Sequence, residues 1–182
     1  MIEVRWHGRG GQGSFTIARL LGMAASVYGG SYAQAFPSFG PERRGAPVLG
    51  FTRIDSNKIT DRSEVDMCDY VVVLDETLWG PGVLSGLKEE TIIIVNTATP
   101  DKYMNQVTNK IITLDATTLA LEYLGRPITN TAMLGALVAV GGFVSLDNCK
   151  DAIGASMNAK IADKNIILIE EAFKKAKEVQ NG

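Results

Sequence analysis

Glycines and one arginine lie where the first strand expected in this sequence meets the first expected helix. Residues 8–13 read Gly-Arg-Gly-Gly-Gln-Gly and fit the pattern G-x-G-x-x-G. Glycine permits a tight turn and lets backbone N–H groups approach a ligand, while the start of the following helix offers unpaired N–H donors and a partial positive charge. A phosphate or carboxylate is therefore the expected guest of a site made of Gly8, Arg9, Gly10, Gly11, Gln12 and Gly13.

The same pattern is weaker evidence for NAD. A dinucleotide-binding fold places an acidic residue at the end of its second strand, where the carboxylate holds the ribose hydroxyls. The second expected strand, residues 31–36, contains no Asp or Glu, and the next acid is Glu42. The sequence thus disfavours ordinary NAD binding. A turn that only packs a helix onto a sheet, with no bound anion, stays open as an alternative.

A second segment combines a restricted backbone with paired positive charge. Residues 34–47 contain three prolines and two glycines, so the loop is stiff and excludes a regular helix. Arg43 and Arg44 place two guanidinium groups side by side, and guanidinium binds phosphate or carboxylate through two parallel hydrogen bonds. If the second strand runs parallel to the first, this loop emerges beside the glycine turn. The alternative is an ion pair with Glu42 or with an acid of a partner subunit.

The remaining polar residues near expected strand ends favour structural roles. His7 is the only histidine and has no catalytic partner beside it in sequence, so we expect a hydrogen bond to backbone. Asp75 follows the run YVVVL, where capping of a short helical turn is favoured over acid–base chemistry. Asn96 follows the run TIIIV and either lines a pocket or satisfies loop backbone. Cys68 has no base nearby in sequence and is expected to be an inert, half-buried thiol.

Composition limits the class of protein further. The 182 residues suit a single domain spanning 1–182, with 46% hydrophobic residues and a net charge of −2, which disfavours a broad nucleic-acid-binding face. Two cysteines and one histidine are too few for an iron–sulfur cluster or a structural zinc site within this chain. The longest apolar stretch, residues 132–146, is shorter than the roughly 20 residues of a membrane helix. We expect a cytoplasmic protein with no membrane segment.

Short β-branched runs and helical periodicity alternate along the chain. They predict an α/β three-layer sandwich with a Rossmann-like first βα unit, a mostly parallel sheet and a helical C-terminal third. The sheet becomes mixed if the second and third strands are joined without a helix. Strands are expected at residues 2–6, 31–36, 48–54, 70–74, 91–95 and 110–114. Helices are expected at residues 12–28 and 115–124, then from a cap at Asn130 through 146, from a cap at Asp147 to about 157, and over the final segment.

Both motifs together resemble the gamma subunit of 2-oxoacid:ferredoxin oxidoreductases. The resemblance rests on residues 7–13 and 34–48 and extends to residues 51–54, 68–75 and 130–136, so it spans nearly the whole chain. The segment Glu-Arg-Arg-Gly-Ala-Pro at residues 42–47 is its most specific part and is most similar to the pyruvate-type branch.

The resemblance implies a role in a larger enzyme. Such enzymes oxidatively decarboxylate a 2-oxoacid, pass the acyl group to coenzyme A and send two electrons to ferredoxin. It implies alpha, beta and delta subunits as partners, with thiamine diphosphate and iron–sulfur clusters held in those partner subunits. This chain, inactive alone, would bind no cofactor by itself and would help to form the coenzyme A site. The alternatives are a nucleotide-binding regulatory module without a redox role and a purely structural subunit whose arginine loop clamps neighbouring chains.

Overall fold

Six strands form one mixed sheet at the centre of the chain. The computed structural model describes residues 1–38, 45–103 and 105–181. The strand order is β2-β3-β1-β4-β5-β6, with parallel pairing from β1 through β6 and antiparallel pairing of β3 with both β1 and β2. The strands are β1 (Ile2–Arg9), β2 (Tyr32–Pro37), β3 (Pro47–Asp55), β4 (Cys68–Val73), β5 (Leu87–Asn96) and β6 (Ile111–Leu114).

The connection between β2 and β3 explains why the sheet is mixed. The described part of this connection contains no helix, so β3 returns antiparallel along β2, with Phe36 opposite Phe51. β3 then pairs with β1 over the full length of β1, from Ile2 opposite Ile54 to Arg9 opposite Pro47. The expectation of a mixed sheet is confirmed. β2 runs parallel to β1 but is separated from it by β3.

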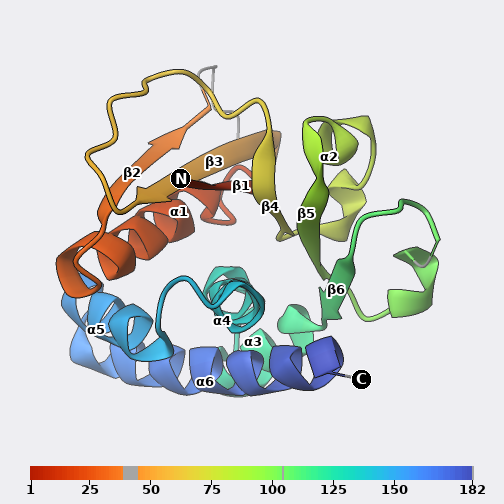
Figure 1. The fold of residues 1–182 in the computed structure, drawn as a ribbon. Coiled ribbons are helices and arrows are strands. Elements are labelled where there is room, and N and C mark those ends of the chain that lie inside the picture. The colour runs from red at the N-terminus through yellow and green to blue at the C-terminus, as the bar shows by residue number, and fades with distance from the viewer. Residues whose placement is uncertain (39–44, 104, 182) are drawn as a thin grey trace.

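The long helices gather on one face of this sheet (Figure 1). The opposite face is covered by short helical turns and by residues 56–67, which pass over β3 and bury Val65 against Phe51. The expected third layer therefore consists of these short segments. The helices are α1 (Ser14–Met23), the π-helix η1 (Ala24–Tyr28), η2 (Glu76–Leu78), α2 (Pro81–Leu84), η3 (Pro100–Tyr103), α3 (Ala116–Leu124), α4 (Asn130–Gly141), α5 (Leu146–Ser156) and α6 (Ala159–Asn181).

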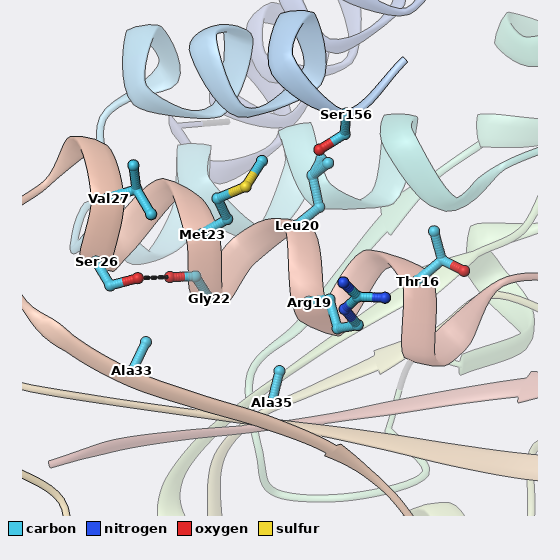
Figure 2. Close-up of a pocket in the computed structure, with 10 residues that line it drawn as sticks. All are labelled: Thr16, Arg19, Leu20, Gly22, Met23, Ser26, Val27, Ala33, Ala35 and Ser156. Atoms are coloured by element: carbon cyan, nitrogen blue, oxygen red, sulfur yellow. Dashed lines mark hydrogen bonds between the residues drawn. The ribbon is translucent and has the colours of Figure 1, made fainter.

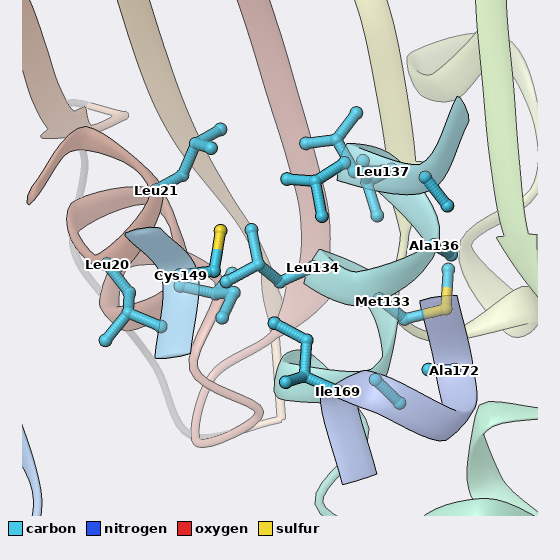
Figure 3. Close-up of a cluster of buried hydrophobic side chains, with 14 of the residues drawn as sticks. Leu20, Leu21, Met133, Leu134, Ala136, Leu137, Cys149, Ile169 and Ala172 are labelled. Atoms are coloured by element: carbon cyan, nitrogen blue, oxygen red, sulfur yellow. The ribbon is translucent and has the colours of Figure 1, made fainter. Parts of the chain in front are cut away.

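Helix α4 forms the centre of the core. Its residues 131–140 are all buried, because α4 lies between the sheet and α6 and meets side chains of α1 and α5 as well (Figure 3). Leu134 and Leu137 are fully buried there. The prediction of a buried core helix in this apolar stretch is confirmed. No helix in the part of the chain that the structure describes is long and apolar enough to cross a membrane.

Two helix boundaries differ from those expected. Helix α4 ends at Gly141 because Gly142 adopts a left-handed conformation and donates its N–H to Val138, so α4 does not continue to residue 146. Its N-cap is Thr129, and Asn130 is already its first residue. Helix α5 is capped by Ser145, whose Oγ accepts from the N–H of Asn148, so the expected cap at Asp147 is wrong by two positions.

Gly135 sets the distance between α4 and α6, which predicts the effect of enlarging it. A Cβ at Gly135 would lie 2.7 Å from the backbone oxygen of Ile169, whereas a Cβ at Gly154, on exposed α5, would meet nothing within 4 Å. We expect Gly135→Ala to lower the free energy of unfolding by about 1–3 kcal/mol through overpacking. Gly154→Ala is the matched control and should raise it by up to about 1 kcal/mol. Urea denaturation measures both, and equal effects would contradict this packing.

Candidate functional site

The glycine segment forms a closed turn between β1 and α1, where the sequence placed it. Gly11 and Gly13 have φ values of 96° and 80°, in the left-handed region that favours glycine. The N–H of Gln12 donates to the oxygen of Arg9 at 2.9 Å, and the Gln12 Oε1 accepts from the N–H of Arg9 at 2.7 Å. Gln12 therefore closes the turn with both its backbone and its side chain.

The start of α1 has the donors that the sequence predicted. Ser14, Phe15 and Thr16 are its first residues, and their N–H groups have no hydrogen-bond acceptor among the described residues. The Ser14 Oγ is also buried without a hydrogen-bond partner there. A Cβ at Gly8 would lie 2.2 Å from this Oγ, so Gly8 is required by the close packing of β1 against α1.

Arg9 is held within the chain. Its Nε and Nη2 both donate to the Thr77 Oγ1, its Nη1 donates to the backbone oxygen of Gly45 at 3.1 Å, and its Nε lies 3.2 Å from the Asp75 Oδ2. The positive charge expected beside the turn is therefore largely balanced by a carboxylate. Arg9 bridges the ends of β1 and β4 and the residues just before β3.

Asp75 is the capping residue that the sequence predicted. It accepts the N–H of Thr77 at 3.0 Å, and its Oδ2 accepts from the Gln12 Nε2 at 2.9 Å. Partial burial acts to raise the pKa of Asp75, but the hydrogen bonds from Thr77 and Gln12 and the nearby charge of Arg9 outweigh it, so the pKa is lowered. Asp75 is thus an ionised anchor for the glycine turn.

A polar cavity of about 340 Å³ opens beside this turn at the carboxyl ends of the parallel strands, the position where ligands bind in such sheets. Asn96 lines it, yet its side chain is fully engaged. The amide donates to Leu74 and to Thr117, and the Oδ1 accepts the N–H groups of Ala116 and Thr117. Both roles expected for Asn96 are therefore observed. It lines the cavity, and it satisfies backbone groups at Leu74 and at the start of α3.

The arginine loop ends beside the glycine turn. Arg43 and Arg44 lie outside the described residues, but the flanks of their loop are placed. The N–H of Gly10 donates to Ala46 at 2.8 Å, and the N–H of Gly45 donates to Gly10 at 3.3 Å. The chain therefore enters β3 directly against the turn, and the two segments that the sequence singled out meet at one end of the molecule.

His7 lies on the face of the sheet that is opposite the long helices, and its hydrogen-bond partner differs from the expected one. Its Nε2 accepts a hydrogen bond from the Arg5 Nε at 3.0 Å, so its partner is a guanidinium group rather than the backbone. Burial, with the Arg5 charge as a second cause, lowers the pKa of His7 to about 3. Arg5 is 4% exposed and donates to the backbone oxygens of Val83 and Ser85. A neutral His7 thus accepts one of the hydrogen bonds of the buried Arg5 guanidinium. Nothing in the sequence of this strand predicts that the two side chains pair.

Cys68 is a structural thiol, as the sequence predicted, but it is fully buried instead of half-buried. Cys68 and Cys149 are both buried, and burial raises the pKa of each thiol, in Cys149 to about 12. Among residues 1–38, 45–103 and 105–181, no group of three His, Cys, Asp or Glu side chains is arranged to hold a metal ion.

A groove of about 540 Å³ was not anticipated from the sequence. It lies between α1 with η1 on one side and β2 on the other, and Ala33 and Ala35 of β2 face Gly22 across it (Figure 2). Its one charged lining residue is Arg19.

The sequence predicted one continuous helix over 12–28, whereas the structure has a π-helical turn at Ala24–Tyr28, and helical periodicity gives no signal for that change.

Comparison with known proteins assigns the chain to a protein family. The family model for pyruvate ferredoxin/flavodoxin oxidoreductase matches residues 3–175. The chain belongs to this family.

Similar proteins agree on which subunit it is. A pyruvate synthase subunit PorC of Methanothermobacter marburgensis is 51% identical over 97% of this chain and 98% of its own length. The pyruvate/ketoisovalerate oxidoreductases common subunit gamma of Pyrococcus furiosus is 46% identical over 96% and 97%. The crystal structure of pyruvate oxidoreductase subunit PORC from Thermotoga maritima has a TM-score of 0.85 at 38% identity, covering 95% of each chain.

These similarities confirm the expectation from sequence that the chain is a gamma subunit of a pyruvate-type 2-oxoacid:ferredoxin oxidoreductase. It is one subunit of a multi-subunit enzyme. The alternative of a nucleotide-binding regulatory module without a redox role is not favoured.

The neutral state of His7 predicts how stability depends on pH. Unfolded His7 binds a proton below about pH 6.5, whereas folded His7 binds one only near pH 3, so folding loses stability as the pH falls through this window. Between pH 7.5 and pH 5 this group should remove about 2 kcal/mol from the free energy of unfolding. His7→Gln keeps an acceptor for Arg5 but has no group that titrates in this range. Between pH 7.5 and pH 5, its free energy of unfolding should therefore fall by about 2 kcal/mol less than that of the unmodified protein. Urea titrations at both pH values test this, and parallel losses in the two proteins would refute it.

Proposed function

We propose that this gamma subunit assembles with alpha, beta and delta subunits into an enzyme that oxidatively decarboxylates pyruvate, forms acetyl-coenzyme A and reduces ferredoxin. Thiamine diphosphate and the iron–sulfur clusters belong to the partner subunits in this proposal. The names of similar proteins support pyruvate as the substrate. The small number of cysteines and histidines in this chain is consistent with that division of cofactors.

The contribution of this chain, in our proposal, is a cradle for the phosphate groups of coenzyme A. Three neighbouring features support it. The free N–H groups at the start of α1 suit an anion, since a helix N-terminus carries partial positive charge. Gln12 and Asp75 hold the turn in one conformation, so little ordering is needed on binding. The flank of the arginine loop is hydrogen-bonded to Gly10.

In this proposal the decisive role belongs to Arg43 and Arg44, and the local charge balance supports it. Arg9 is paired with Asp75, and Glu76 lies in the same cavity lining, so the described side chains do not make this end of the molecule positive by themselves. An anion carrying several charges needs further cations. The two guanidinium groups of Arg43 and Arg44 directly precede Gly45, which is hydrogen-bonded to Gly10, and guanidinium binds phosphate through paired hydrogen bonds. The single observation that carries the proposal is the junction of Gly10 with Gly45 and Ala46.

The test uses the assembled enzyme with both arginines reversed. We expect Arg43→Glu with Arg44→Glu to raise the KM for coenzyme A about tenfold or more, because charge-assisted contacts to phosphate are lost. The KM for pyruvate should stay unchanged. Arg62→Glu is the matched control, since Arg62 is an exposed arginine of another loop and forms no ion pair with a described residue.

Two results would contradict the cradle. If the double variant fails to assemble while Arg62→Glu assembles, and if coenzyme A does not restore assembly, the arginine loop is a clamp for partner chains. If the double variant assembles with an unchanged KM for coenzyme A, the loop does not contact that ligand. The isolated chain serves as a further control and should reduce no ferredoxin.

A further inference from the structure

A second pocket, separate from the glycine turn, combines apolar walls with unpaired positive charge. It lies where α3 ends, α4 begins, α5 ends and α6 begins, among helices that pack on the same face of the sheet, and its volume is about 400 Å³ (Figure 1). None of residues 8–13 lines it. The lining comprises Leu124, Arg126, Ile128, Asn130, Met157, Lys160, Ile161, Lys164 and Asn165.

The cations of this pocket are not balanced within the chain. Arg126, Lys160 and Lys164 are exposed, and within residues 1–38, 45–103 and 105–181 no carboxylate forms an ion pair with any of them. In contrast, Lys150 on neighbouring α5 is paired with Asp147 and Glu170. Three like charges around one cavity repel each other, and an anion between them would relieve that repulsion.

The apolar part of the pocket is unusually open to solvent. Ile128 is 46% exposed and Ile161 is 50% exposed, although both belong to a cavity wall that also includes Leu124 and Met157. Covering these side chains removes apolar surface from water and so favours binding. The cavity volume lies within the range of small-molecule sites, about 300–1,000 Å³, in which mostly apolar walls carry a few polar groups.

Of the two amide side chains at this pocket, Asn165 adds hydrogen-bonding capacity. Asn165 is 5% exposed and donates through Nδ2 to the oxygen of Ile161, while its Oδ1 accepts no hydrogen bond from a described residue. Asn130 accepts the N–H of Thr131 through Oδ1, and its Nδ2 likewise has no acceptor among the described residues. The Asn165 Oδ1 is thus an acceptor left over at a cavity that already holds cations and apolar surface, whereas the Asn130 Nδ2 lies beside Gly13 of the glycine turn.

We infer that this pocket binds a small organic anion, an apolar or aromatic body that carries a phosphate or similar acidic group. The apolar body would pack on Ile128 and Ile161, and the acidic group would pair with Arg126, Lys160 and Lys164. A small molecule fits better than a polypeptide segment because the apolar and charged groups converge on one concavity instead of extending along a surface. The inference does not depend on coenzyme A binding at the glycine turn.

The test is fluorescence titration of the full chain with 8-anilinonaphthalene-1-sulfonate, an aromatic anion. Two partial probes accompany it: N-phenyl-1-naphthylamine, which has the same aromatic body without the acid, and inorganic phosphate as a competitor, which has the charge without the body. We expect the sulfonate to bind at least tenfold more tightly than the neutral amine. Phosphate alone should displace it only at millimolar concentration.

Variants locate the site. Lys164→Glu and Ile161→Ser should each weaken binding of the sulfonate about fivefold or more. Lys174→Glu is the matched control, because Lys174 is exposed on the same helix, lines none of the pockets described above and forms no ion pair with a described residue. Because the side chains of Ile161, Lys164 and Lys174 are exposed, each variant should fold. Circular dichroism and thermal unfolding verify this.

Several outcomes would overturn the inference. These are equal binding of the anionic and neutral probes, equal effects of Lys164→Glu and Lys174→Glu, or no binding at millimolar probe. Protection of Ile161 and Lys164 from solvent only after a partner subunit is added, with no probe binding before, would also overturn it and assign the pocket to a protein contact. Arg43→Glu with Arg44→Glu should leave the probe titration unchanged, which separates this inference from the proposed coenzyme A cradle.

Discussion

The antiparallel pairing of β3 with β1 is the constraint on which the candidate site depends. It runs without a break to Arg9 opposite Pro47, so the residues that precede β3 must lie against the residues that follow β1. The hydrogen bonds of Gly10 with Ala46 and Gly45 continue the same ladder into the turn. Without the inserted β3, the arginine loop would be a distant crossover. With it, the loop and the glycine turn share one end of the sheet.

The position of β3 between β2 and β1 also distinguishes this fold from a dinucleotide-binding fold. In that fold the second strand lies beside the first, and its end reaches the ribose. Here β2 is two strands from β1, or roughly 10 Å at the usual spacing of about 4.8 Å. The Rossmann-like first βα unit keeps the free N–H groups at the start of α1 but lacks the neighbouring strand whose end would contact a nucleoside. A phosphate-rich ligand that extends toward partner subunits is consistent with this arrangement.

Much of this was predictable, and the failures have physical reasons. β-branched runs located the strands, and the stiff segment at 34–47 predicted the mixed sheet, because both are local properties of the sequence. The partner of His7 was not predictable, since the burial of Arg5 depends on carbonyl groups of residues 83 and 85 that only folding brings near. The caps at Thr129 and Ser145 were misplaced by one or two residues, because neighbouring Asn and Asp side chains are equally good capping groups by type.

In the proposed function, the glycine turn and the two arginines form one part of a coenzyme A site that partner subunits complete. The most direct test is therefore a structure of the assembled enzyme with coenzyme A bound. We predict phosphate oxygens within hydrogen-bond distance of the N–H groups of Ser14 to Thr16 and of the Arg43 or Arg44 guanidinium. Coenzyme A bound elsewhere, with both arginines paired to carboxylates of a partner chain, would contradict it.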